Sequence, residues 1–174
     1  WKQQASQPPL YYYLSAGLTF WVDTTDMPTV RHLNPHVDNG VITPDGNINL
    51  VVHDPALNPW AGTLLAVRII RQFSVLLGVC AVYLTSLIAQ EVTEREELVV
   101  GATAVHAFTP MYLFVTGAVN NDNLVVPLAS LSLLLMIRAV KAEHVSWQRW
   151  LMLGGVIGLA ALAKISGVGL LFLA

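Results

Sequence analysis

Four consecutive polar residues, Asn120-Asn121-Asp122-Asn123, stand between two long apolar runs and are the first candidates for chemistry. A carboxylate surrounded by amides suits a metal ion or a sugar hydroxyl. The same residue types also favour a plain tight turn, because Asn and Asp side chains bond to nearby backbone. The composition of the turn alone favours the plain turn, so its chemistry depends on which polar residues share its side of the molecule.

Long apolar runs are the elements that must position this turn. A helix that crosses a bilayer needs roughly 20 apolar residues, and four runs after residue 60 have about that length. Pro110 should kink the second of them, because proline cannot continue the helical hydrogen-bond ladder. The predicted spans cover about 66–89, 98–119, 124–140 and 151–174.

Composition places the chain in a membrane. Of 174 residues, 55% are hydrophobic and 11% are charged, whereas soluble domains carry about 25% charged residues. The net charge of −2 argues against a nucleic-acid partner. A single cysteine, Cys80, excludes an internal disulfide. We expect an all-α polytopic membrane protein, and a start without Met suggests a piece of a longer chain.

The first 60 residues are more polar and should form one extracytoplasmic segment. Residues 10–22 follow Pro8-Pro9 and are rich in aromatics but too short to span, so they predict a helix lying in the membrane interface. A short spanning helix is the alternative. Residues 23–60 predict an ordered loop, with a hairpin that pairs 41–42 with 48–52.

The loop also contains a weak metal-site candidate. His53 and Asp54 are adjacent, and neutral imidazole is the commonest metal ligand. The spacing of the loop's His and Asp residues matches no standard zinc pattern, so ordinary solvated polarity explains them equally well.

Basic residues set the predicted orientation. Arg138, Lys141 and Arg149 flank the last connection, whereas the turn at 120–123 contains no Lys or Arg. Because cytoplasmic loops carry an excess of basic residues, the turn at 120–123 and the segment 1–60 should both lie on the extracytoplasmic side. Their polar residues would then line one pocket at the outer rim of the membrane.

Three basic residues could serve that pocket. Arg68 and Arg71 lie near the outer rim, where a guanidinium could hold a lipid phosphate. Both arginines could instead extend their side chains to the headgroup region without binding a substrate, and this explains their positions equally well. Lys164 lies within the last apolar run, and a charge at such depth is a functional candidate by default.

Several short motifs occur in an order that resembles a known family. The chain resembles membrane glycosyltransferases of the GT-C fold, in particular bacterial relatives of the protein O-mannosyltransferases (glycosyltransferase family 39) and of the aminoarabinose transferase acting on lipid A. Each motif alone is common, and their order carries the resemblance. The motifs are Gln7-Pro8-Pro9-Leu10-Tyr11-Tyr12, Arg68 or Arg71 with Ser74 and Gly78, Phe108-Thr109-Pro110, Gly117 to Leu124, and Gly158 to Lys164.

The resemblance implies a helical-bundle enzyme that transfers a hexose or pentose from a polyprenyl-phosphate donor to a protein or glycan acceptor. The main catalytic carboxylate would precede Trp1, so this piece alone should be inactive. Asp122 matches a second, supporting carboxylate near the donor phosphate or a divalent metal ion. It could act through that ion or by orienting an Arg or Lys. The implied substrate-binding residues are Gln7, Pro8, Tyr11, Arg68, Arg71, Asn121 and Lys164.

One departure from the family pattern concerns the approach to Pro8-Pro9. An acidic residue often precedes this stretch in the family, whereas Gln3, Gln4 and Gln7 occupy it here. The resemblance further implies the bacterial cytoplasmic membrane as location. Two other function classes remain: a transporter or flippase-like subunit, and a non-catalytic membrane scaffold. A transporter should contain inverted repeats, which the sequence does not show.

Overall fold

The computed structural model describes residues 7–33, 51–52 and 54–174. These residues belong to two compact units, one formed by 18–69 and one by 1–17 together with 70–174. His53 and most of the predicted 41–52 hairpin lie outside the described residues.

The unit 18–69 contains short elements and the start of a long helix. A helical turn, α2 (Met27–Val30), precedes strand β1 (His32–Leu33), which pairs antiparallel with β2 (Val51–Val52). The described part of the predicted hairpin strand therefore pairs with His32–Leu33. The other predicted partner, 41–42, is not described.

Asp26 caps the N-terminus of the long helix α3 (Gly62–Val92). Its Oδ1 accepts hydrogen bonds from the Thr63 backbone N–H at 2.9 Å and the Thr63 hydroxyl at 2.6 Å. These bonds lower the pKa of the Asp26 carboxyl below its usual value of 3.8. Gly62 has φ +54°, and a Cβ there would lie 2.1 Å from Asp26 Oδ2, so only glycine fits this approach.

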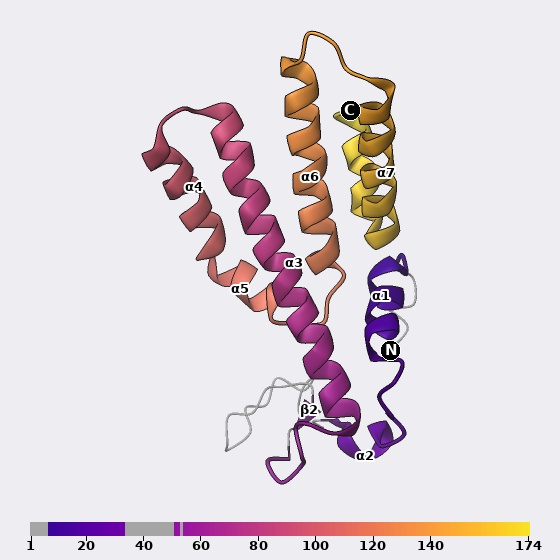
Figure 1. The fold of residues 1–174 in the computed structure, drawn as a ribbon. Coiled ribbons are helices and arrows are strands. Elements are labelled where there is room, and N and C mark those ends of the chain that lie inside the picture. Colours follow the sequence, from indigo (N-terminus) through magenta and orange to yellow (C-terminus); the bar gives the residue numbers. More distant parts are fainter. Residues whose placement is uncertain (1–6, 34–50, 53) are drawn as a thin grey trace. The chain divides into compact units, whose positions relative to one another are not determined.

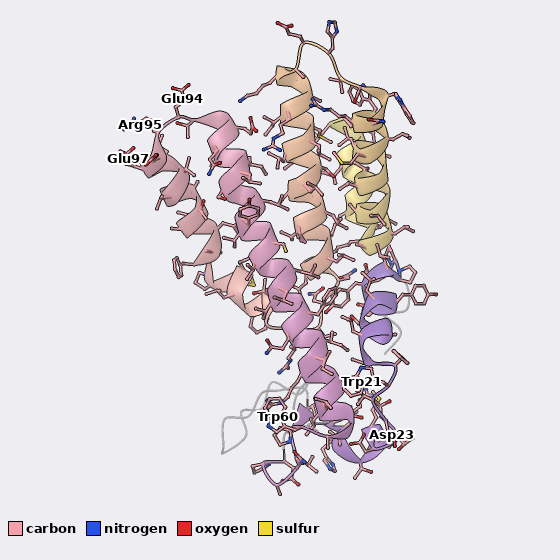
Figure 2. All side chains as sticks on the ribbon, viewed as in Figure 1. Trp21, Asp23, Trp60, Glu94, Arg95 and Glu97 are labelled. Carbon is pink, nitrogen blue, oxygen red and sulfur yellow. The ribbon has the colours of Figure 1, made fainter. Side chains whose placement is uncertain are left out.

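The second predicted span is two helices. α4 (Glu96–Ala107) and α5 (Pro110–Thr116) meet at 57°. Proline disfavours a helical conformation in the residue before it, and Thr109 is accordingly extended at φ −64°, ψ 118°. The bend expected at Pro110 is therefore observed, and it interrupts the helix completely. Glu94 and Arg95 lie between α3 and α4, and Glu97 lies in the first turn of α4 (Figure 2).

Helices α6 (Asp122–Lys141) and α7 (Trp147–Ala163) run side by side (Figure 1). The continuous helix expected over 151–174 is interrupted. The chain leaves α7 at Lys164, which is extended, and continues as a 3-10 helix, η2 (Ile165–Phe172), packed back on α7. Gly167 allows this return, because a Cβ there would lie 2.4 Å from the carbonyl carbon of Ala160.

Helix α1 (Leu10–Thr19) completes the second unit through its first eight residues. It ends three residues before the predicted boundary. The hydrophobic core gathers where α1, the start of α6 and the end of α7 meet, so it lies directly beneath the residues of the polar turn. Its buried members are Tyr11, Leu124, Val125, Ala160 and Ala163.

Among the described residues, two helices are long and apolar enough to cross a bilayer: α3 with 31 residues and α6 with 20. The bent pair α4–α5 is a third if it forms one broken span. With 17 residues, α7 is close to the lower limit for a span. The fold is therefore that of a helical membrane bundle, as expected, with breaks in two of the four predicted spans.

Candidate functional site

Asp122 and Lys164 form an ion pair between two helix ends. The Lys164 Nζ donates a hydrogen bond to Asp122 Oδ1, across 42 residues of sequence. Each side chain keeps 31% of its surface exposed. The pair is therefore shielded enough for its Coulomb attraction to matter, and still open to a ligand.

Local backbone structure explains why each partner is there. Asp122 is the first residue of α6, where the helix dipole favours a negative charge. Its backbone N–H is satisfied by Asn120 Oδ1 at 3.1 Å, which is the turn chemistry expected of Asn. Lys164 has just left α7, so it lies at the mouth of the bundle and not in the middle of a continuous helix. The apolar run predicted one continuous helix through Lys164, whereas the structure ends α7 at this residue.

Asn121 ties this site to two distant segments. It is 4% exposed, and its Nδ2 donates to the Ala163 carbonyl at 3.1 Å and to Gln7 Oε1 at 3.4 Å. The residue before Asp122 is thus bound to the residue before Lys164. Gln7 and Pro8 are half-buried at the start of α1.

Asn123 is the third amide of the turn and is 3% exposed. Its Nδ2 donates to the Ala118 carbonyl at 2.8 Å, closing the turn between α5 and α6. Its Oδ1 is buried and has no hydrogen-bond partner among the described residues. The turn therefore contains one acceptor that the described protein groups do not use.

The two tyrosines of α1 have different environments. Tyr11 has no exposed surface, its hydroxyl shares a 2.7 Å hydrogen bond with Ser74 Oγ, and its ring stacks on Phe73. It therefore fixes α1 against α3. The pKa of the neighbouring Tyr12 is raised above its usual value, mainly by burial. The nearby Tyr11 and the negative charge of Asp122 raise this pKa further, and the positive charge of Lys164 opposes the shift.

Tyr12 therefore lies within the electrostatic field of the ion pair, and it was not singled out from the sequence. Helical spacing was the available signal, since adjacent helix positions point in directions about 100° apart. One of two consecutive tyrosines can pack inward while the other lies nearer the turn.

The remaining predicted site residues make contacts within their own units. The Arg68 guanidinium lies 4.7 Å from the Trp60 ring centroid within the unit 18–69. Arg71 is exposed on α3. Asp54 is exposed and accepts the Ala56 backbone N–H at 2.8 Å. Residues 7–33, 51–52 and 54–174 contain no group of three or more His, Cys, Asp or Glu side chains arranged to hold a metal ion.

Comparison with known proteins identifies a family. The family model described as dolichyl-phosphate-mannose-protein mannosyltransferase matches residues 61–174, well over half of the chain. No curated protein and no solved structure matches the chain. The matched region contains α3 to η2 and both members of the Asp122–Lys164 pair.

Proposed function

Since the chain belongs to the dolichyl-phosphate-mannose-protein mannosyltransferase family, a family of GT-C membrane glycosyltransferases, we propose that it forms part of an enzyme using a polyprenyl-phosphate sugar as donor. The sugar would pass to a protein or glycan acceptor on the extracytoplasmic face of a bacterial cytoplasmic membrane. Family membership favours this function over the transporter and scaffold alternatives.

The Asp122–Lys164 pair is the observation that carries the proposal. A carboxylate repels a phosphate, so Asp122 must act through a positive charge. Lys164 supplies one: its ammonium has three N–H donors, and one of them is held by Asp122. The other two can reach phosphate oxygens of a donor at the partly exposed mouth of the bundle.

Lys164 would then stabilise the negative charge that grows on the polyprenyl phosphate as the bond to the sugar breaks. Asp122 would hold the ammonium in position through their hydrogen bond. Asn121 holds the two chain segments together through the Ala163 carbonyl. The catalytic base for the acceptor hydroxyl would come from a part of the enzyme that precedes Trp1.

A divalent metal ion at Asp122 is the alternative way to bridge carboxylate and phosphate. Asp122 would offer one carboxylate and the neighbouring amides would offer carbonyl oxygens. The structure favours Lys164 as the bridging cation because its ammonium already contacts the carboxylate. His53 and Asp54 stay weak candidates for a separate metal site.

The test is Asp122→Asn in the full-length enzyme. This change keeps the shape of the side chain and removes the charge that orients Lys164. We expect transfer of labelled sugar from polyprenyl phosphate to fall at least about tenfold, which corresponds to about 1.4 kcal/mol in the activation barrier. Transfer is measured with purified protein whose folding is verified separately.

Asp23→Asn is the matched control, since Asp23 is an exposed carboxylate in the other unit whose Oδ1 accepts the Thr25 N–H. It should leave transfer unchanged. If the Asp122→Asn enzyme transfers sugar at the wild-type rate, residues 120–123 form a structural turn with no role in transfer. Addition of a chelator separates the two bridging schemes, because only the metal scheme predicts a loss of activity that divalent ions restore.

A further inference from the structure

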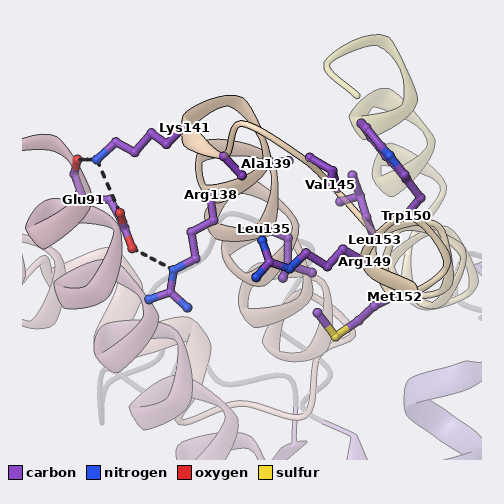
Figure 3. Close-up of a pocket in the computed structure, with 11 residues that line it drawn as sticks. Glu91, Leu135, Arg138, Ala139, Lys141, Val145, Arg149, Trp150, Met152 and Leu153 are labelled. Atoms are coloured by element: carbon purple, nitrogen blue, oxygen red, sulfur yellow. Dashed lines mark hydrogen bonds and ion pairs between the residues drawn. The ribbon is translucent and has the colours of Figure 1, made fainter. Parts of the chain in front are cut away.

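A second charged cluster lies at the other end of α6. Arg138 and Lys141 come from the last turns of α6, and Arg149 comes from the first turn of α7. The three side chains line a cavity of about 430 Å³ (Figure 3). This volume is within the usual range for small-molecule sites, about 300 to 1,000 Å³.

The cavity carries an excess of positive charge. Glu91, at the end of α3, is the one acidic residue among its lining side chains. Arg138 Nε donates to Glu91 Oε1 at 2.7 Å, and Lys141 Nζ lies 3.3 Å from Oε2. Three positive charges therefore face one negative charge, which leaves an excess of two.

Arg149 is the member whose position needs an explanation. Its guanidinium has no ion-pair partner among the residues that the structure describes. It also lies at the N-terminus of α7, where the helix dipole disfavours a positive charge. The N-cap residue Ser146 makes no side-chain hydrogen bond to the first turn. An anion in the cavity would satisfy both the guanidinium and this helix end.

The rest of the lining is apolar or aromatic. Trp150 is half-exposed, and Trp is typical of the headgroup level of a bilayer. Leu135, Met152 and Leu153 supply an apolar wall beside the basic groups. The arrangement combines forked guanidinium donors, which match phosphate oxygens, with surface that suits an acyl chain.

The position of the cavity separates it from the Asp122 site. α6 has 20 residues, and at about 1.5 Å per residue it is about 30 Å long, the thickness of the hydrocarbon core. The cavity and the Asp122–Lys164 pair therefore lie at opposite ends of a helix long enough to cross the bilayer. A donor phosphate at Asp122 cannot also occupy the cavity.

We propose that this cavity binds the phosphate headgroup of an anionic phospholipid in the leaflet opposite the Asp122 site. The headgroup phosphate lies between Arg138 and Arg149, and its acyl chains follow the apolar wall. A free phosphate ion has the same headgroup chemistry without the chains. The apolar lining favours the lipid.

The test uses full-length protein in nanodiscs of phosphatidylcholine with a minor fraction of phosphatidylglycerol. Lipids released after delipidating washes are quantified by mass spectrometry. We expect phosphatidylglycerol to be retained above its bulk fraction, and Arg149→Gln to reduce that enrichment about fivefold. Arg149→Lys should retain an intermediate amount. Because Arg149 has no ion-pair partner to lose in the described part of the chain, these variants should fold normally, as verified by their melting temperatures.

Arg95→Gln is the matched control, since Arg95 is an exposed basic residue at the α3–α4 turn and does not line the cavity (Figure 2). It should leave the enrichment unchanged. Equal retention of both lipids, or an equal loss with Arg95→Gln, would show nonspecific surface attraction and overturn the proposal. If millimolar inorganic phosphate removes the enriched lipid from wild-type protein, the ligand is a soluble phosphate and the lipid assignment is wrong.

Discussion

Lys164 and Asp122 depend on each other at the level of single residues. Each side chain is about two thirds covered, so an unpaired charge at either position would be poorly solvated. Exposed ion pairs contribute at most about 1 kcal/mol, and breaking a fully buried pair costs about 3–5 kcal/mol. We place this pair between those limits, so both charges should matter for folding as well as for phosphate binding.

Lys164 variants separate these two roles. Lys164→Met in the full-length enzyme should lower sugar transfer at least about tenfold, because the bridging charge is lost. Lys164→Arg keeps the charge and should retain part of the activity. Transfer is assayed at equal amounts of folded protein. Equal sugar transfer by the wild type, Lys164→Met and Lys164→Arg would show that the Lys164 ammonium is only solvated and takes no part in transfer.

The double variant Asp122→Asn with Lys164→Met tests whether the residues act as a unit. If Asp122 works by orienting Lys164, the double variant should be about as active as Lys164→Met alone. Multiplicative losses would instead indicate two independent functions. The yield of folded protein from each variant shows how much the ion pair contributes to folding.

Asp26 predicts a pH dependence in the unit 18–69. Hydrogen bonds from Thr63 lower the pKa of its carboxyl below 3.8, so the ionised form is favoured by folding. Its contribution is complete above the unfolded value and is lost as the pH falls through the lower folded value. Amide exchange at Thr63, corrected for the chemical exchange rate, should lose protection as the pH falls below about 4.

Asp26→Ala is the reference state for that measurement. It should lack the extra protection at every pH, because the acceptor itself is removed. Identical pH profiles for wild type and Asp26→Ala would show that the cap does not stabilise the start of α3.

At the level of elements, interruptions determine where the site lies. Apolar length predicted four spans, with a kink expected at Pro110, and the structure breaks two of them. The break at Pro110 was predictable because proline has a fixed effect on the residue before it. The break at Lys164 was not, because no proline marks it and the return that follows it depends on the close approach of Gly167 to Ala160, a contact between segments.

Two glycines of η2 test that contact. In Gly167→Ala the new Cβ would meet the Ala160 backbone at 2.4–2.5 Å, and a backbone cannot move aside as a side chain can. We expect a loss of about 1–3 kcal/mol, seen as a lower melting temperature of the full-length protein in detergent. Gly169→Ala has no atom within 4 Å of the new Cβ and should change stability by less than about 0.5 kcal/mol. Equal melting temperatures for the two variants would contradict the close packing of η2 on α7.

For the whole molecule, the orientation in the membrane stays a prediction from basic residues. In a Cys80→Ser background, a cysteine at Asn120 should react with an impermeant thiol reagent applied to intact cells. A cysteine at Glu143 should react only after the membrane is opened. Asn120 is chosen over its neighbour because Asn121 is buried and bonded. Labelling of Glu143 but not Asn120 from outside would reverse the orientation.

The site illustrates what local sequence can and cannot reveal. The polar turn and the interest of Lys164 followed from residue type and the length of apolar runs, and a supporting role for Asp122 was implied by the family resemblance. Their pairing did not, because helix packing across 42 residues brings them together. Tyr11 was expected to bind substrate and is instead fully buried against Ser74, since periodicity alone did not identify which face of α1 packs inward.

The Asn121 amide has a consequence for synthesis of the protein. Its acceptor, the Ala163 carbonyl, is 42 residues further along the chain. At about 5–20 residues per second, a ribosome adds those residues in about 2 to 8 s. Throughout that interval α6 can enter the bilayer with Asp122 lacking its counter-ion. The Asp122–Lys164 pair and the Asn121 bond to Ala163 can therefore form only after α7 has been made.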